Sequence, residues 1–277
     1  MSALPTSRKR RTGLAHTILG VAILAVLLFP LYWMLDTSLQ PNQAGGVKTP
    51  WFPIHPSLHG YTQAFHDQGG HLLTSLVIAL GCVAFSLLIA APAAYALAQL
   101  NISGVGVVLL LILISQMIPG IVVANALYRL YSDLGLLNSI PGLILADSAL
   151  AIPFAILILR AFMLTLPRSI MEAARVDGAG PLRVFASVVL PVSRNAIITA
   201  ALFSFLFAWG DFLFALTLTT GDNVRPLTVG LYLYVGAYVS DWSAAMATAV
   251  MASIPAIVLL VIAQRYIAAG TTAGAVK

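Results

Sequence analysis

Six long apolar segments restrict what this chain can fold into. They lie at about residues 14–35, 72–98, 105–130, 139–163, 194–219 and 244–266. Each is long enough to cross the roughly 30 Å hydrocarbon core of a bilayer as a helix of about 20 residues. Only 8% of the 277 residues are charged, whereas soluble domains carry about 25%. The sequence therefore predicts an all-α integral membrane protein with six transmembrane helices in a single domain, residues 1–277.

The positions of the basic residues predict how these helices are oriented. If the N-terminus is cytoplasmic, eleven of the 14 Lys and Arg residues lie on the inner side of the membrane. Only Lys48, Arg129 and Arg225 then lie outside. Because cytoplasmic loops carry an excess of Lys and Arg, we expect both termini to be cytoplasmic. The net charge of +5 thus reflects topology, and no nucleic-acid partner is predicted.

A charged island separates the fourth apolar segment from the fifth. Residues 172–191 read EAARVDGAGPLRVFASVVLP. Besides Glu172, the ionised side chains in or just before this stretch are Arg168, Arg175, Asp177 and Arg183. Burying these four at the centre of a membrane helix would cost about 10–14 kcal/mol. The island is therefore expected outside the membrane.

The same island carries the signals of two short helices joined by a turn. Gly178 and Gly180 permit the backbone conformations that end a helix. Pro181 suits the first turn of the helix that follows. We expect this helix–turn–helix to occupy a cytoplasmic loop at about residues 164–193.

The residue order in the island resembles the cytoplasmic coupling loop of permease subunits from binding-protein-dependent ABC importers. The matching positions are Glu172, Ala173, Ala174, Asp177, Gly178, Ala179, Phe185, Leu190 and Pro191. The resemblance implies a type I ABC importer fold, in which this loop seats in a groove of a separate ATPase. Ala173 and Ala174 would let the backbone approach closely, and Glu172 would offer a charge-assisted acceptor. The alternative is an ordinary solvated inner loop.

The C-terminal sequence carries a second resemblance. Residues 264–277, QRYIAAGTTAGAVK, are similar to the tail of carbohydrate-type permeases of the maltose class. In that family the tail, here about residues 267–277, reaches into the interface of the ATPase pair. Gly270, Gly274 and Ala275 would allow an extended, thin entry. A frayed terminus is the alternative.

No part of the sequence is suited to nucleotide hydrolysis. Its three lysines, Lys9, Lys48 and Lys277, all lie outside any G-x-x-x-x-G-K-[ST] pattern. We therefore expect no catalytic residues, no metal and no cofactor in this chain, with ATP and Mg bound by a partner. The family resemblance implies four kinds of partner: a second homologous permease, an ATPase homodimer, an extracytoplasmic solute-binding protein and membrane lipid.

Two carboxylates lie inside apolar segments, where an ionisable side chain is costly and suggests a functional site. They are Asp147 and Asp211. With Gln116 and Asn125 they are candidates to line a path for a sugar. Two other interpretations stay open. The carboxylates could cap helix kinks or lie at the membrane interface, or they could meet as the pair of an intramembrane aspartyl protease.

The sequence as a whole predicts a permease subunit of an ATP-driven importer for sugars or oligosaccharides, in a bacterial or archaeal plasma membrane. Within the family, glycerol-phosphate or another polyol is the alternative solute. Because no Lys or Arg lies deep in an apolar segment, a neutral solute is favoured. From a different class, a stand-alone channel or an intramembrane enzyme would also have six helices.

Overall fold

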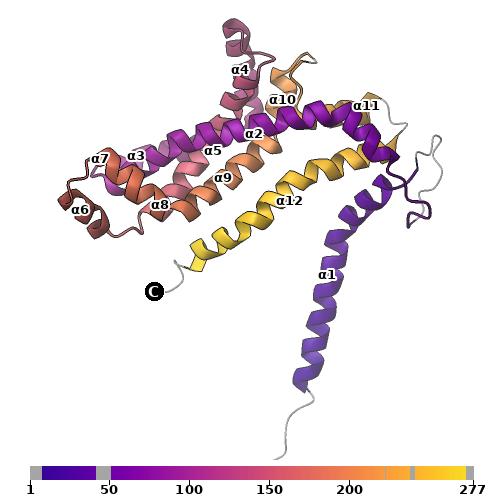
Figure 1. Cartoon of the computed structure of the whole chain (residues 1–277), viewed down its shortest axis with the longest axis horizontal. Helices are drawn as coiled ribbons and strands as arrows, with labels where there is room; N and C mark the ends of the chain where they lie inside the picture. The colour runs from indigo at the N-terminus through magenta and orange to yellow at the C-terminus, as the bar shows by residue number, and fades with distance from the viewer. Residues whose placement is uncertain (1–7, 42–50, 222, 238–240, 273–277) are drawn as a thin grey trace, which may run out of the picture. The chain divides into compact units, whose positions relative to one another are not determined.

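The computed structural model describes residues 8–41, 51–221, 223–237 and 241–272. Within these ranges the regular secondary structure is entirely helical. The elements are α1 (Arg8–Ser38), α2 (His59–Gln99), α3 (Val105–Ser115), α4 (Gly120–Leu134), α5 (Ile140–Met163), α6 (Arg168–Val176), α7 (Pro181–Val184), the π-helix η1 (Phe185–Val189), α8 (Leu190–Val192), α9 (Arg194–Trp209), α10 (Leu213–Leu218), α11 (Leu227–Ala237) and α12 (Trp242–Thr272) (Figure 1). The all-α prediction is confirmed for this part of the chain.

The chain divides into two compact units. Unit 1 comprises Met1–Asp67 and Tyr234–Met251, and unit 2 comprises Gln68–Leu233 and Ala252–Lys277. Helices α2 and α12 each contribute residues to both units. That the units act as one domain stays a prediction.

Six membrane crossings can be formed from the described helices. Four single helices are long and apolar enough, namely His16–Ser38 of α1, α2, α5 and Trp242–Tyr266 of α12. Two further candidates are pairs of helices that bend at a short break. The predicted number of six holds if each bent pair makes one crossing.

The third predicted span, residues 105–130, is not one continuous helix. It breaks between α3 and α4, and the two arms meet at 90°. The break ends at Pro119, which has no N–H to donate to an earlier carbonyl and has an extended conformation with φ −58° and ψ 131°. Pro119, where a helix break is expected from the sequence, thus lies at a sharp bend in the structure.

The fifth predicted span, residues 194–219, is also interrupted. Helix α9 ends at Trp209, and α10 begins only at Leu213. The Asp211 carboxylate accepts hydrogen bonds from the amides of Phe214 (3.3 Å) and Ala215 (2.8 Å), which start the new helix. At its other end, α9 makes an angle of 78° with the helical stretch Pro181–Val192.

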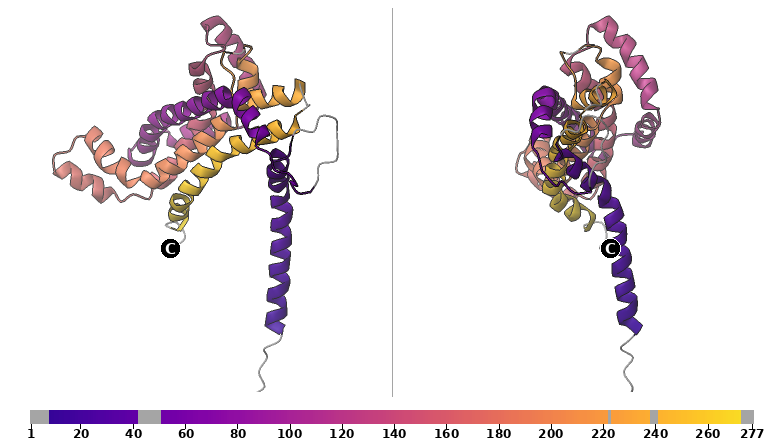
Figure 2. Two further views of the ribbon diagram at one scale, coloured as in Figure 1. Left: turned by 45° about the vertical axis from the view of Figure 1, so that its right-hand side comes forward. Right: turned by 90° about the vertical axis from the view of Figure 1, so that its right-hand side faces the viewer.

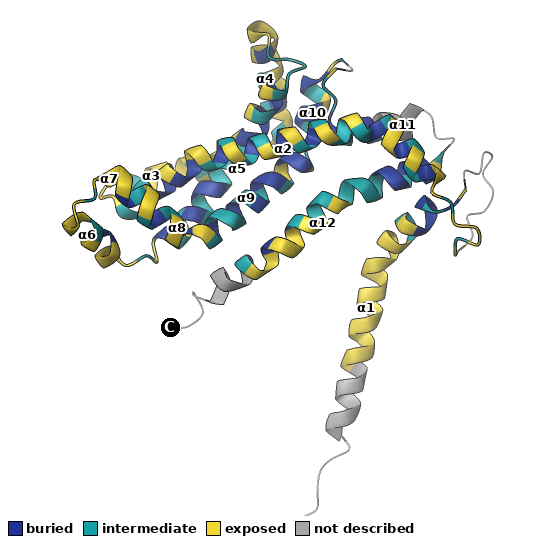
Figure 3. Ribbon diagram, in the orientation of Figure 1, coloured by how far each residue is buried: buried dark blue, intermediate teal, exposed yellow. Residues whose placement is uncertain are grey.

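Helices α5 and α9 lie side by side and form the centre of unit 2 (Figure 1, Figure 3). Small residues such as Ala155 and Ala200 are fully buried in the core that the two helices share, and small side chains let membrane helices approach closely. Farther along the same pair, the Phe154 ring lies 5.2 Å from Phe203 and 5.4 Å from Phe207 in edge-on arrangements. The two helices are therefore held together by close packing and by aromatic contacts.

Helix α1 differs from α5 and α9 because most of its described length is exposed. None of the residues in its most apolar window is buried within the chain, and Figure 3 shows most of its described length as exposed. A surface this apolar is stable only against lipid or another protein. The exposure of α1 agrees with its prediction as a membrane helix.

In unit 1, the first turns of α2 and α12 meet at Gly60 and Ser243. A Cβ atom on Gly60 would lie 2.8 Å from the Ser243 carbonyl oxygen and 2.9 Å from its carbonyl carbon. Ser243 Oγ in turn donates to the Ser38 carbonyl (3.3 Å), and Ser38 Oγ lies 2.8 Å from Tyr61 Oη. The missing side chain at Gly60 is thus what allows this contact.

We predict that Gly60→Ala destabilises the protein, whereas Gly106→Ala does not. Overpacking costs about 1–3 kcal/mol, which exceeds the gain of about 1 kcal/mol in helix propensity. Both glycines are the second residue of a helix, but a Cβ on Gly106 meets nothing within 4 Å. Thermal unfolding of the purified protein in detergent measures the difference. Equal melting temperatures for the two variants would contradict the close contact.

Candidate functional site

The island at residues 172–191 folds as a helix–turn–helix, as predicted, at one end of unit 2 (Figure 1, Figure 2). Helix α6 ends where Gly178 takes the left-handed conformation, φ +84°. The amides that follow the helix bond back to it, Gly178 N to Arg175 O and Ala179 N to Ala174 O, both 3.0 Å. Glycine is strongly preferred at a left-handed position that closes a helix, because residues with a Cβ atom are strained there. Gly180, at φ −68°, then begins α7.

A π-helix continues the second arm of this segment. In η1 the amide of Leu190 bonds to the carbonyl of Phe185, five residues earlier. Pro191 follows directly, and a proline inside a helix lacks an N–H and crowds the preceding turn. The wider π-turn before it accommodates the ring. Single π-turns are often found at functional sites, and this one could not be predicted from composition.

The inner face of the segment is fixed to the core of unit 2. Val184 and Val189 are fully buried, and Met171 is 6% exposed. The Phe185 ring lies 5.3 Å from the Tyr95 ring of α2. Four of the predicted coupling residues are partly buried against this core, and these are Ala174, Ala179, Phe185 and Leu190. The segment is therefore continuous with the helix packing rather than a loosely attached loop.

The outer face of the segment is available to a partner. The other predicted coupling residues are exposed, namely Glu172, Ala173, Asp177, Gly178 and Pro191. No described residue forms an ion pair with Glu172. Two apolar side chains flank the turn and are almost fully exposed, Val176 at 87% and Leu182 at 84%. Sequence reasoning missed this pair, although large apolar residues in a segment placed outside the membrane are a usable signal.

Two side chains join the ends of α2 and α5 next to this segment. Arg160 Nε of α5 donates to the Leu97 carbonyl of α2 (3.2 Å). In the reverse direction, Gln99 Nε2 of α2 donates to the Met163 carbonyl and, at 3.5 Å, to Leu166 O. The last carbonyls of a helix have no partner within it, so each helix supplies a donor for the end of the other. We call this arrangement the reciprocal clamp; it was not predicted from the sequence.

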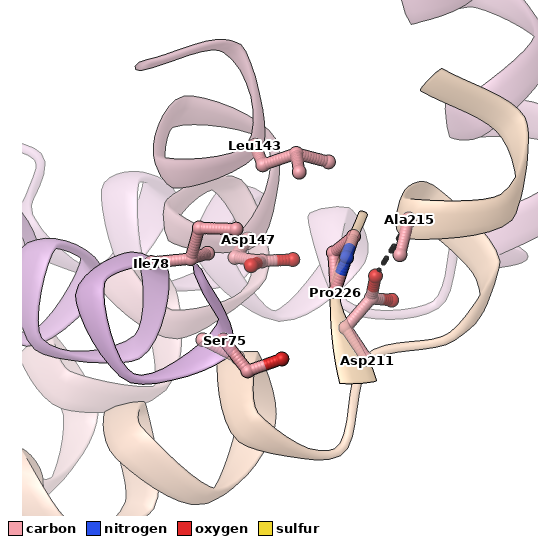
Figure 4. Close-up of a pocket in the computed structure, with 8 residues that line it drawn as sticks. Ser75, Ile78, Leu143, Asp147, Asp211, Ala215 and Pro226 are labelled. Atoms are coloured by element: carbon pink, nitrogen blue, oxygen red, sulfur yellow. Dashed lines mark hydrogen bonds between the residues drawn. The ribbon is translucent and has the colours of Figure 1, made fainter. Parts of the chain in front are cut away.

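A small pocket in unit 2 brings Asp147 and Asp211 together (Figure 4). Its lining comes from four parts of the chain and consists of Ser75, Ile78, Leu143, Asp147, Ala208, Asp211, Ala215 and Pro226. The space is about 10 Å³, close to what one water molecule needs. The pocket in this chain alone is therefore much too small for a sugar.

The two carboxylates in the pocket have different surroundings. Asp211 caps α10 through its bonds to Phe214 N and Ala215 N, so the capping interpretation holds for this residue. Asp147 is only 4% exposed, and no hydrogen bond to its carboxylate is present among the described residues. It lies close enough to Asp211 to interact with it electrostatically. Asp147 has no comparable structural role to explain it.

The remaining candidates lie elsewhere. Gln116 is exposed at the break between α3 and α4, and Asn125 is exposed on α4, so neither lines the pocket with the two carboxylates. Near the C-terminus the backbone at Gly270 is helical, since α12 continues to Thr272, and the extended conformation expected there is not present. Gly274 and Ala275 lie outside the described residues.

Comparison with known proteins identifies similar chains. A family model described as "Binding-protein-dependent transport system inner membrane component" matches residues 86–272. The sulfoquinovosyl glycerol transport system permease protein of Agrobacterium fabrum is 37% identical, over 90% of this chain and 89% of the relative. The trehalose/maltose transport system permease protein of Thermococcus litoralis is 30% identical, over 94% and 95%.

The fold is also similar to a solved structure. A chain from a bacterial ABC transporter involved in the import of the acidic polysaccharide alginate superposes with a TM-score of 0.80. The match covers 96% of this chain and 99% of that one, at 23% identity. At this identity the likeness concerns the fold, which is that of a type I ABC importer permease.

We predict that Asp211→Ala destabilises the protein by about 0.5–2 kcal/mol, the usual cost of losing a helix cap. Asp211→Asn retains an acceptor and is expected to lose less. Asp147→Asn replaces a buried carboxyl group that has no hydrogen bond among the described residues with a neutral amide, so its stability should equal or exceed that of the wild type. Melting temperatures of the three variants test this. A larger loss for Asp147→Asn than for Asp211→Ala would contradict the assigned roles.

Proposed function

The chain belongs to the family of inner membrane components of binding-protein-dependent transport systems, and we propose that it carries sugars or oligosaccharides as one permease subunit of an ATP-driven importer. Several relatives are named for carbohydrate solutes, among them diacetylchitobiose, trehalose and maltose. The proposal places the subunit in the plasma membrane of a bacterium or archaeon, with both termini cytoplasmic. The positions of its basic residues support that orientation.

The observation that carries the proposal is the two-sided helix–turn–helix at residues 172–191. Its exposed face presents the carboxylates of Glu172 and Asp177 together with two protruding apolar side chains, Val176 and Leu182. This face is suited to a groove that supplies a cationic or amide donor and an apolar wall. The partner proposed for it is one subunit of an ATPase homodimer, which would bind ATP and Mg.

The buried face explains how movement of the ATPase could reach the membrane helices. Core packing at Val184 and Val189, and the contact of Phe185 with Tyr95, connect the segment to unit 2. The reciprocal clamp then joins the ends of α2 and α5. When ATP binding closes the ATPase pair, the segment moves as a rigid body and takes these helix ends with it. The helices rotate from inward-facing to outward-facing, and hydrolysis resets them.

A second, homologous permease is proposed to complete the translocation path. The pocket at Asp147 has room for about one water molecule in this chain, so a sugar needs a wider space between two subunits. Exposed polar side chains on or beside α4, Gln116 and Asn125, could line such a space.

Two further contacts belong to the proposal. On the outer side, a solute-binding protein would deliver the sugar. On the inner side, the tail with Gly270, Gly274 and Ala275 would enter the ATPase interface.

The pocket also favours a neutral solute over glycerol-phosphate. Its charged lining residues are the two acids Asp147 and Asp211, whereas a phosphate group requires basic donors. An intramembrane aspartyl protease is not favoured, because Asp211 is engaged in capping α10. A stand-alone channel gives no role to the exposed face of the helix–turn–helix.

We predict that Glu172→Ala abolishes uptake without reducing the amount of protein in the membrane. The Glu172 side chain is exposed and has no ion pair in the described chain, so folding does not depend on it. Loss of one charge-assisted hydrogen bond, worth about 1.5–3 kcal/mol, corresponds to about 10- to 100-fold weaker ATPase binding. Co-purification of the ATPase and solute uptake are measured together.

The matched control for this substitution is Asp133→Ala, which removes another exposed carboxylate, on α4 and outside the coupling segment. It should leave both uptake and ATPase association unchanged. Unchanged uptake in Glu172→Ala would overturn the docking role of the segment. A chain that purifies without any ATPase, even as wild type, would overturn the proposed importer itself.

We also predict different effects for two neighbouring glycines. Gly178→Ala puts a side chain on a residue at φ +84°, at a cost of about 1–2 kcal/mol, and so distorts the turn. Gly180→Ala, at φ −68° and with open space around the new Cβ, should be close to wild type. Uptake per ATP hydrolysed, measured in proteoliposomes, should fall for the first variant only. Equal coupling in both would show that the shape of the turn is unimportant.

A further inference from the structure

A cluster of five aromatic side chains, here called the aromatic collar, lies at the last turns of α1 in unit 1. It consists of Phe29, Tyr32 and Trp33 on the helix and of Trp51 and Phe52 on the following loop. The Trp33 and Trp51 rings are 5.8 Å apart, and Phe29 lies 6.2 Å from Trp51. Tyr32 and Phe52 are in edge contact at 6.2 Å. These contacts hold the loop against the helix end.

Two hydrogen bonds to backbone carbonyls hold the same loop against the end of α1. Tyr32 Oη donates to the Trp51 carbonyl, and the Ser57 amide donates to the Leu39 carbonyl at 2.7 Å. The stretch from 51 to 58 is thus attached at one end to α1 and at the other to Leu39, the residue that follows α1. It is a positioned surface, not a free linker.

This positioned stretch is apolar and exposed. Trp51, Phe52, Ile54 and Leu58 are 65%, 70%, 73% and 66% exposed. Between 51 and 58 the one ionisable side chain is His55. A contiguous apolar surface of this kind marks an interaction site.

The level of the collar along α1 indicates what covers it. The other end of α1 carries the basic run at residues 8–11, which belongs at one surface of the bilayer. From Arg11 to Trp33 the helix rises by about 33 Å at 1.5 Å per residue. This matches the hydrocarbon thickness of roughly 30 Å. The collar therefore lies where the opposite interface begins, the level at which Trp and Tyr are enriched.

The irregular backbone of the loop sets how deep it can lie. Non-helical backbone exposed to lipid is not tolerated within the hydrocarbon core, because its N–H and C=O groups have no partners there. At the interface, water and headgroups satisfy them. The loop is consequently restricted to the headgroup level.

We propose that residues 51–58, held by the aromatic collar, lie in the interfacial layer of the membrane and bind lipid with Trp51, Phe52, Ile54 and Leu58. The segment extends the exposed apolar surface of α1 into the headgroup region and fixes the depth of that helix. Lipid is favoured over a protein partner because the surface coincides with the end of the hydrophobic span and is continuous with it. The assignment does not depend on which solute the transporter carries.

The test places nitroxide spin labels on single introduced cysteines in the full chain, reconstituted in lipid nanodiscs. Ile54→Cys is the probe, and Val26→Cys, whose parent residue is equally exposed at 73% within the α1 span, is the lipid reference. His66→Cys, where the parent side chain is 86% exposed, is the water reference. The native Cys82 is buried and stays in place, with the unsubstituted chain as background control.

Collisions with oxygen, which concentrates in lipid, are compared with collisions with a water-soluble nickel chelate. The oxygen-to-nickel ratio at residue 54 is expected to be several-fold above that at residue 66 and below that at residue 26. A ratio equal to that at residue 66 would place the loop in water and overturn the proposal. A label shielded from both reagents would mean that protein covers the surface, and would overturn it equally.

Discussion

Helix ends and breaks inside a membrane need hydrogen-bond partners, and the fold depends on how this chain supplies them. Lipid offers no donors or acceptors to a free backbone group. At the break after α9, the Asp211 carboxylate serves the first amides of α10. At the start of α11, Ser75 Oγ accepts the Leu227 amide at 2.8 Å. At the ends of α2 and α5, the reciprocal clamp serves carbonyls. Each partner comes from a side chain, so polar residues in this protein are first of all structural.

This requirement has a mechanical consequence. A side chain that satisfies the end of another helix also ties the two helices, because separating them would expose a polar group to a medium without partners. Arg160 and Gln99 tie α2 to α5 beside the helix–turn–helix. Tyr95 and Phe185 add an aromatic contact between α2 and that segment. The groups that stabilise this end of unit 2 are thus the same groups that would transmit a movement of the segment.

The sequence predicted two kinds of feature. These are the helices, which form from long apolar segments, and the turn, which forms from the backbone preferences of glycine and proline. The apolar segments gave the helices, and Gly178 and Pro181 gave the turn, because a left-handed residue and a first-turn proline have strong local preferences. A break at Pro119 was expected, but not its angle of 90°, and neither the end of α9 at Trp209 nor the π-helix before Pro191 was predicted. These depend on the exact backbone geometry at Pro119, Asp211 and Pro191, which the composition of an apolar segment does not specify. The reciprocal clamp was missed because its partners are about 63 to 67 residues apart in sequence, whereas the exposed pair Val176 and Leu182 had a usable local signal.

The two buried acids show where sequence reasoning reaches its limit and structure adds to it. By sequence, Asp147 and Asp211 are equivalent, since each is a carboxylate in an apolar segment. In the structure they share one pocket, yet Asp211 has two backbone amides to satisfy its charge and Asp147 has none among the described residues. Burying an unsatisfied carboxylate is costly, so the fold alone gives no reason for Asp147. A role in the proposed translocation path between two permeases would account for this residue, which the packing of the chain does not explain.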